Sequence, residues 1–300
     1  MKQTRRLFLK TMATLPVLAA VPAAWQRAAA KSAPGVQKLR LSLNAYSFNT
    51  LLRNGSMDLD ALLEFCAGMP LDAVDLTGYY FPGYPAVPPD EYIYHIKQKA
   101  FRLGLDISGT GVRTDFTQAD SAKRKADVQL VKNWIVAASK LGAPVIRIFA
   151  GGEAPAGETW ERTAARLMEH VEECTAFGKA HGVMIGLQHH NDFIKTAEQV
   201  HAICSMNTSP WFGIIVDTGS YRSGDPYRQI AETARYAVNW QIKENVFENG
   251  KELPADLEKI ISAVKASGYR GYLPVETLGP GDPKQKVPVF VEKVRKALYS

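Results

Sequence analysis

The amino-acid sequence predicts a single closed (β/α)8 barrel, and three observations support this prediction. Eight short apolar segments alternate with eight helix-like stretches over about 260 residues, the number of units and the length expected of such a barrel. No linker divides this stretch, which indicates one domain over residues 39–300. The competing open sheet usually has a glycine-rich phosphate loop after its first strand, but here the first strand continues as LSLNAYSFN.

The predicted strands are short apolar runs, a pattern typical of parallel strands that are buried on both faces. They are expected at Leu39–Ala45, Ala73–Leu76, Leu105–Gly109, Pro144–Phe149, Val183–Leu187, Phe212–Val216, Ala237–Ile242 and Gly271–Val275.

The predicted helices lie between and after these strands and place apolar residues three and four positions apart. They are expected at Asp58–Gly68, Asp90–Gly104, Ser121–Gly142, Thr159–Gly182, Thr196–Met206, Asp225–Arg235, Ala255–Gly268 and Asp282–Leu298. Several end in glycine, which favours a left-handed cap at the carboxyl end. These glycines are Gly68, Gly104, Gly142, Gly182 and Gly268.

Residues 1–30 have the pattern of an export signal. Arg5 and Arg6 precede an apolar run over 12–25, and small residues follow it. This order is typical of a removable signal peptide, and paired arginines are typical of the twin-arginine (Tat) route. The run is too short and too interrupted for a membrane span. We therefore predict a twin-arginine signal peptide at 1–30, a linker at 31–38, a periplasmic location and the Tat translocon as a partner during export.

The charge distribution argues against a nucleic-acid-binding protein, and the cysteine content argues against a disulfide-stabilised one. Five of the basic residues behind the net charge of +6 lie in residues 1–30, which contain no acidic residue. The rest of the chain is nearly neutral, so no nucleic-acid partner is predicted. The three cysteines, Cys66, Cys174 and Cys204, cannot all pair and lack metal-type spacing. We expect a fold that does not depend on disulfides.

Polar side chains follow the last four predicted strands, where a barrel of this class places its function. Alternate side chains on a strand share a face, so Gln188 is expected to point with His190, and Gln241 with Lys243. The predicted inward ring consists of Gln188, His190, Asp217, Gln241, Lys243 and Glu276.

This ring suits both a metal ion and acid–base chemistry. Two carboxylates and two amide oxygens are ligands for Mg²⁺, Mn²⁺ or a similar divalent ion. The predicted metal ligands are Gln188, Asp217, Gln241 and Glu276. The predicted catalytic residues are Glu276, His190 and Lys243, because carboxylate and imidazole transfer protons and an ammonium stabilises negative charge.

The strand ends resemble those of the xylose isomerase-like barrel superfamily, the sugar phosphate isomerase and epimerase group. In that family they typically contain Glu-Asn-His, Asp-Thr-Gly, His-x-Lys-Asp and a final Glu. The corresponding segments here are Gln188-His189-His190, Asp217-Thr218-Gly219, Gln241-Ile242-Lys243-Glu244 and Val275-Glu276-Thr277. The resemblance covers essentially the whole chain after the signal. It implies one divalent metal held by Glu, Asp, His and Glu, and proton transfer beside a sugar carbonyl.

Two positions depart from that pattern. Gln188 replaces the family's Glu and Gln241 replaces its His, so two implied ligands are neutral amides. An amide oxygen adds no charge to the site, and we expect weaker metal binding. Gln188 also cannot accept a proton, so a scheme with two metal-bound glutamates as bases cannot operate. Acid–base chemistry then falls to Glu276 with the neighbouring histidine and lysine side chains.

Four more residues are candidate substrate contacts. Arg147 lies within an apolar strand, where it either pairs inside the barrel or contacts substrate. Asp75 is expected to face the same mouth. Tyr80 belongs to the aromatic and proline-rich segment Tyr79–Pro89, which either stacks on sugar rings or packs over the first helix. His189 either contacts substrate or caps the following helix.

These observations favour an exported enzyme that acts on a non-phosphorylated sugar or keto-sugar by proton abstraction beside a carbonyl, as a sugar isomerase or epimerase. A lyase or dehydratase acting on a keto-sugar, cyclitol or 3-keto-glycoside is the second hypothesis, because it needs one base and one acid. A barrel that binds a small carbohydrate without catalysis is the third. A homo-oligomer is possible under each of them.

Overall fold

The structure is a computed structural model, and it describes residues 39–300 of the chain. The predicted signal peptide at 1–30 and linker at 31–38 lie outside the described residues, so both stay predictions. Residues 39–300 belong to one compact unit.

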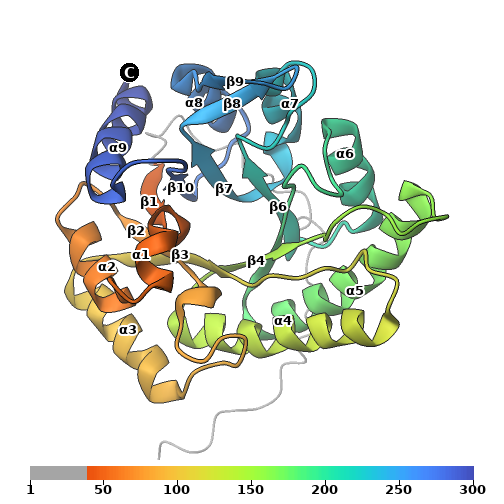
Figure 1. Cartoon of the computed structure of the whole chain (residues 1–300), viewed down its shortest axis with the longest axis horizontal. Helices are drawn as coiled ribbons and strands as arrows, with labels where there is room; N and C mark the ends of the chain where they lie inside the picture. The colour runs from red at the N-terminus through yellow and green to blue at the C-terminus, as the bar shows by residue number, and fades with distance from the viewer. Residues whose placement is uncertain (1–38) are drawn as a thin grey trace, which may run out of the picture. The chain divides into compact units, whose positions relative to one another are not determined.

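Eight parallel strands close into a barrel, and helices surround it (Figure 1). The strand order around the barrel is β1-β10-β7-β6-β5-β4-β3-β2. This arrangement confirms the predicted single (β/α)8 barrel. The barrel strands are β1 (Arg40–Asn44), β2 (Ala73–Thr77), β3 (Asp106–Gly111), β4 (Val145–Phe149), β5 (Met184–Gln188), β6 (Phe212–Asp217), β7 (Ala237–Lys243) and β10 (Tyr272–Glu276).

The eight predicted helices are all present, with ends that differ from the predicted ones by a few residues. Most begin at an Asp or Thr whose side chain accepts a hydrogen bond from a backbone N–H of the first turn, as Asp58 does from Ala61. The helices are α2 (Leu59–Ala67), α3 (Asp90–Arg102), α4 (Ser121–Leu141), α5 (Trp160–His181), α6 (Ala197–Met206), α7 (Pro226–Thr233), α8 (Leu257–Ala266) and α9 (Pro283–Tyr299).

Three local features differ from the prediction. The chain leaves β1 through a short 3-10 helix and the helix α1 (Asn49–Arg53) before it reaches α2. An antiparallel hairpin, β8 (Asn245–Glu248) and β9 (Lys251–Pro254), follows β7 and forms its own sheet. Gly68 has a φ of −79°, so α2 does not end in the left-handed cap that Gly142 provides for α4 with a φ of 85°.

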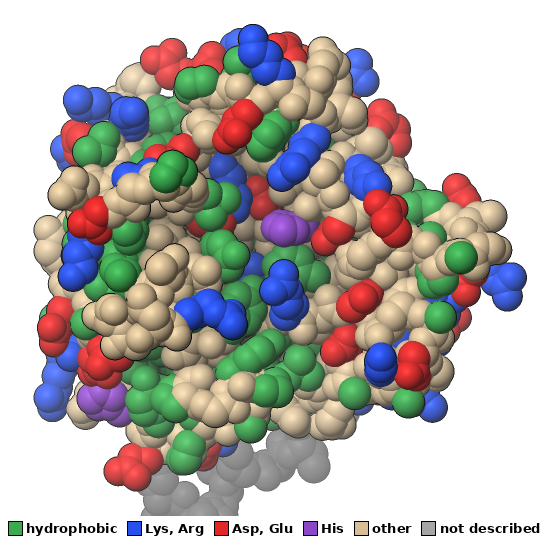
Figure 2. Space-filling view, in the orientation of Figure 1, with side chains coloured by type: hydrophobic (Ala, Val, Ile, Leu, Met, Phe, Trp, Pro, Cys, Tyr) green, Lys and Arg blue, Asp and Glu red, His purple; other side chains and the backbone are tan. Residues whose placement is uncertain are grey.

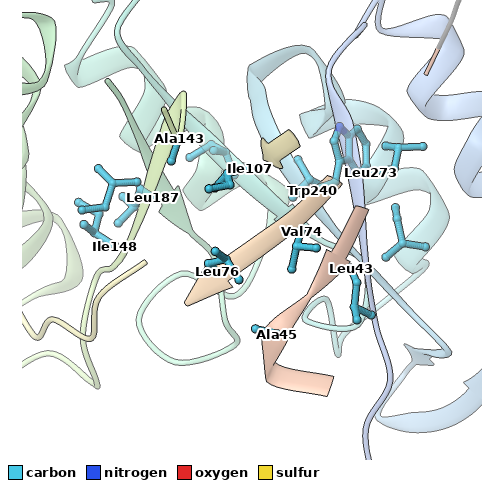
Figure 3. Close-up of a cluster of buried hydrophobic side chains, with 14 of the residues drawn as sticks. Leu43, Ala45, Val74, Leu76, Ile107, Ala143, Ile148, Leu187, Trp240 and Leu273 are labelled. Atoms are coloured by element: carbon cyan, nitrogen blue, oxygen red, sulfur yellow. The ribbon is translucent and has the colours of Figure 1, made fainter. Parts of the chain in front are cut away.

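The apolar core lies mainly between the barrel strands and the surrounding helices. Leu43, Val74, Leu76, Leu187 and Trp240 are among its buried side chains (Figure 3). On each strand they alternate with side chains that point into the barrel. The three cysteines are also buried, and none is paired. Within residues 39–300, no helix has the length and hydropathy of a membrane span.

We expect Gly213→Ala to destabilise the barrel. Gly213 lies on β6, and a Cβ atom there would approach the backbone oxygen of Tyr236 to 2.7 Å and press on Val238. Backbone cannot yield as a flexible side chain does, so the free energy of unfolding should fall by about 1–3 kcal/mol. Gly68→Ala is the control, because its Cβ would meet only one atom, at 3.5 Å. Urea denaturation measures both, and equal stability of the two variants would contradict the prediction.

Candidate active site

Polar side chains fill the interior of the barrel and bond across it. Ser42 on β1 and Ser108 on β3 lie 2.6 Å apart between their hydroxyl oxygens. Asn239 on β7 donates to Asp75 on β2 over 3.3 Å. None of these strand pairs is adjacent in the barrel, so the side chains must point inward. The barrel interior therefore contains a layer of polar side chains, and the polar side chains at the strand ends extend this layer.

A connected polar ring lies at the carboxyl ends of β5, β6, β7 and β10. The Gln188 amide donates to Asp217 over 2.7 Å and to Gln241 over 2.9 Å. The Lys243 ammonium lies 3.5 Å from Asp217 and donates to Glu276. All five side chains are buried. The structure thus brings together five of the six residues predicted for the ring, from four segments far apart in the sequence.

Arg147 supports this ring from β4. Its guanidinium donates to the Gln188 amide oxygen over 3.1 Å and to the Tyr79 hydroxyl, and it lies over the Phe149 ring. Because a guanidinium can only donate, this contact directs the oxygen of Gln188 toward Arg147 and its NH₂ group toward Asp217. Arg147 is buried and does not line the cavity that opens over the ring, so it reaches a substrate only indirectly in this structure.

A cavity of about 450 Å³ opens over the ring; we name it the polar cavity. Asp217, Lys243 and Glu276 form part of its lining, whereas Gln188 and Gln241 lie behind them. A volume of this size accommodates a small organic ligand. The space-filling view of the same face shows acidic, basic and histidine side chains near its centre (Figure 2).

The two neighbouring histidines lie in different surroundings. His190 lines the polar cavity, is half exposed, and packs edge-on against Phe149. His189 is fully buried, stacks on Tyr221 and accepts a hydrogen bond from the backbone of Asp217. Burial lowers the pKa of His189 to about 4, so its ring is neutral at pH 7. His190 can reach a ligand, and His189 instead holds the strand end in place.

A second cavity, of about 680 Å³, lies beside the first three strands; we name it the aromatic cavity. Tyr80 lines it together with Tyr46, Tyr79 and Tyr84. The Tyr80 hydroxyl donates to Asn49 over 2.9 Å, which fixes the Tyr80 side chain. The aromatic segment predicted at Tyr79–Pro89 therefore forms part of a cavity wall. A third cavity of about 440 Å³ shares lining residues with both of the others.

Opposing effects set the protonation of the ring. Burial lowers the pKa of Lys243, but the charges of Asp217 and Glu276 outweigh it and raise that pKa above the usual value. Burial raises the pKa of Asp217, but Lys243 and then His190 outweigh it and lower that pKa. At neutral pH Lys243 is therefore an ammonium and Asp217 a carboxylate.

Asp75 lies one layer deeper and gives a pH-dependent prediction. Burial raises its pKa to about 6, against the opposing charge of Arg147. A folded-state pKa above the unfolded value means that stability falls as the pH rises from about 4 to about 6. Asp75→Asn should remove this loss and raise the free energy of unfolding at pH 7 by up to about 3 kcal/mol, with little effect at pH 4. Denaturation at both pH values measures this, and equal changes at both would contradict it.

The donor set of the ring does not fit a divalent cation. The two carboxylates already share the Lys243 ammonium, and Gln188 presents hydrogen-bond donors to Asp217 and Gln241. Among residues 39–300, no group of three or more His, Cys, Asp or Glu side chains could hold a metal ion. The metal site predicted on Gln188, Asp217, Gln241 and Glu276 thus gains no support from the geometry.

Sequence reasoning missed the part of the polar cavity that the β8–β9 hairpin supplies. Asn245, Phe247 and Glu252 line the cavity from this hairpin. A signal was present in the sequence, because Asn249-Gly250 is a typical two-residue hairpin turn between alternating residues. Both residues have the positive φ that such a turn requires, 48° and 81°.

The chain belongs to the xylose isomerase-like TIM barrel family, whose sequence profile it matches over residues 63–294. The polar ring lies within the matched range. The fold and this match together place the chain in the class of xylose isomerase-like barrels. A comparison with curated proteins finds no match.

Solved structures with the same fold include sugar epimerases. The D-psicose 3-epimerase from Clostridium cellulolyticum H10 is 15% identical, with a TM-score of 0.71 over 87% of this chain and 99% of that one. The 3-keto-D-glucoside 4-epimerase from E. coli is 12% identical, with a TM-score of 0.69 over 86% and 100%. An L-ribulose 3-epimerase is 19% identical, with a TM-score of 0.66 over 87% and 95%. At these identities the likeness concerns the fold.

Proposed function

We propose that this chain is a sugar isomerase or epimerase that removes a proton from the carbon beside the carbonyl of a non-phosphorylated sugar or keto-sugar. The observation that carries the proposal is the Lys243–Glu276 ion pair on the wall of the polar cavity, at the carboxyl ends of the barrel strands. A carboxylate beside a fixed ammonium provides a base and a stabiliser for the oxyanion that forms. The epimerase neighbours and the family support the same class of reaction.

Each residue of the proposed site has a separate task. Glu276 accepts the proton from carbon, and Lys243 stabilises the negative charge that develops on the neighbouring oxygen. His190, on the wall of the same cavity, exchanges protons with the substrate oxygen or with solvent. Asp217 holds Lys243 in position from the opposite side. The residues behind them, Gln188 among them, orient the ring.

A lyase or dehydratase acting on a keto-sugar, cyclitol or 3-keto-glycoside is the second candidate. The amide of Gln188 is a donor to Asp217, so it cannot serve as a second base opposite Glu276. A site with one base and one histidine acid suits elimination, in which a proton leaves one carbon and a hydroxyl or glycosyl oxygen leaves the next. Loss of a group changes the product mass, and epimerisation does not.

We also propose that the protein is exported by the Tat route to the periplasm. The support is the paired Arg5-Arg6 ahead of an apolar run in residues 1–30. A periplasmic enzyme meets free sugars and glycosides more than sugar phosphates, which fits the non-phosphorylated substrate. Fusion of residues 1–38 to a reporter that is active only after export, with Arg5 and Arg6 both replaced by lysine as control, tests this proposal.

Solvent deuterium exchange tests the proposed reaction. The purified protein is incubated in D₂O with D-psicose, D-tagatose, L-ribulose and a 3-keto-glucoside, and the sugars are analysed by NMR and mass spectrometry. Deuterium beside the carbonyl with otherwise unchanged mass supports the isomerase or epimerase. An unsaturated product of lower mass supports the lyase. Binding of a sugar without exchange would contradict both and indicate a carbohydrate-binding barrel.

A further inference from the structure

We infer that the Lys243 ammonium takes the place of the divalent cation that the family resemblance implies, so that this barrel holds its ligand without a metal. The inference concerns the same ring as the proposed function, but it does not require that this ring catalyse the proposed reaction. Three features of the ring carry it: the position of Lys243, the orientation of Gln188 and the partners of the carboxylates.

The Lys243 ammonium lies between the two carboxylates of the ring, the place where a bound cation would be expected. It comes from β7 and reaches carboxylates on β6 and β10, the strands on either side of it. Its side chain is 9% exposed, and Asp217 and Glu276 are 1% and 4% exposed. Two buried carboxylates so close together need a positive charge between them, and here a covalently attached one provides it. A divalent ion at the same point would meet a buried ammonium at contact distance.

The amide groups of Gln188 and Gln241 are oriented as hydrogen-bond partners and not as metal ligands. A metal ligand must turn its oxygen toward the ion, but Gln188 turns its NH₂ group toward Asp217 and Gln241 and its oxygen toward Arg147. The oxygen of Gln241 is also used, as the acceptor for that NH₂ group. The two positions that lack the family's Glu and His are therefore joined to each other by a hydrogen bond. Amides in this pairing need no cation.

The inference predicts an exchange of one cation for another when Lys243 is removed. Lys243→Met leaves Asp217 and Glu276 buried without a counter-charge, beside the amide of Gln241. Such a site is unstable when empty, and it offers oxygen ligands to a divalent ion. We therefore expect the full chain carrying Lys243→Met to melt at least about 5 °C below the wild type in EDTA. Mn²⁺ should restore much of this loss in a saturable manner.

The experiment compares the wild type, Lys243→Met and Lys286→Met in EDTA and in Mn²⁺ at up to about 1 mM. This concentration is at the upper end of the dissociation constants of protein cation sites. Metal analysis and thermal melting are the readouts, and neither depends on turnover. The wild type should contain no stoichiometric metal and show no shift with Mn²⁺. Lys286→Met is the matched control, because Lys286 lines the same cavity and pairs with Glu244 at 3.3 Å instead of with the ring. It should respond to Mn²⁺ as the wild type does.

Two results would overturn the inference. One is stoichiometric metal in the wild type that is lost in Asp217→Asn. The other is Lys243→Met with wild-type stability or with no response to Mn²⁺. If Lys243→Met does not fold in EDTA, refolding with and without Mn²⁺ replaces the melt, and the wild-type metal content decides the question independently. A protein without metal that also fails to turn over sugars would leave this inference standing while the proposed reaction fails.

Discussion

Glu276→Gln is expected to reduce proton exchange beside the sugar carbonyl by about 10²–10⁴-fold, the usual contribution of a positioned general base. The amide keeps the size of the side chain and can still accept a hydrogen bond from Lys243, but it cannot take a proton from carbon. Lys243 also retains Asp217 at 3.5 Å, so the fold should tolerate the change. The exchange rate in D₂O and the melting temperature, measured on the same preparation, separate catalysis from stability.

Glu244→Gln is the matched control for this experiment. Glu244 lines the same cavity, but its carboxylate pairs with Lys286 at 3.3 Å and accepts from the backbone of Leu278. We expect its exchange rate to stay within about threefold of the wild type, as for a surface contact of small energy. If Glu276→Gln retained activity similar to that of Glu244→Gln, Glu276 would not be the base.

Arg147→Met is expected to lower the free energy of unfolding by about 3–5 kcal/mol at neutral pH. The change removes the donors to Tyr79 and Gln188 and leaves the buried Asp75 without an opposing charge. Because the pKa of Asp75 rises further without Arg147, the deficit should grow as the pH increases through about 6. Urea denaturation at pH 5 and pH 8 measures both effects.

An exposed arginine provides the comparison for that prediction. Arg235 lies over the ring of its neighbour Tyr236 and bonds to its hydroxyl, with the side chain at the surface. Arg235→Met should change the free energy of unfolding by no more than about 0.5 kcal/mol at either pH. A similar small change for Arg147→Met would show that the buried network stabilises the fold much less than its contacts suggest.

The sequence predicted the barrel and the polar ring because both depend on local patterns. Each barrel strand has apolar residues that pack against helices, and helix caps such as Asp58 mark the boundaries. The polar tips at Gln188, Asp217 and Gln241 follow from the rule that parallel strands present their carboxyl ends at one side. Their proximity is a consequence of the fold class, so it could be predicted without coordinates.

The remaining parts of the site depend on contacts that no local pattern encodes. The cross-barrel contacts of Ser42 and Asn239 join strands that are not adjacent in the barrel, so their partners cannot be predicted from the pattern of either strand. The direction of the Gln188 amide depends on Arg147, which comes from a different strand. His189 and His190 are adjacent in sequence, and only the structure shows that His189 is buried against Tyr221 whereas His190 lines the polar cavity.

The three buried thiols leave the fold without a disulfide that a reductant could break. Cys66, Cys174 and Cys204 are unpaired, and burial raises the pKa of each thiol, so little thiolate forms near neutral pH. A thiol reagent should therefore modify them only when the barrel opens. The rate of modification with and without a sugar would then measure how far a ligand suppresses opening, without an enzyme assay.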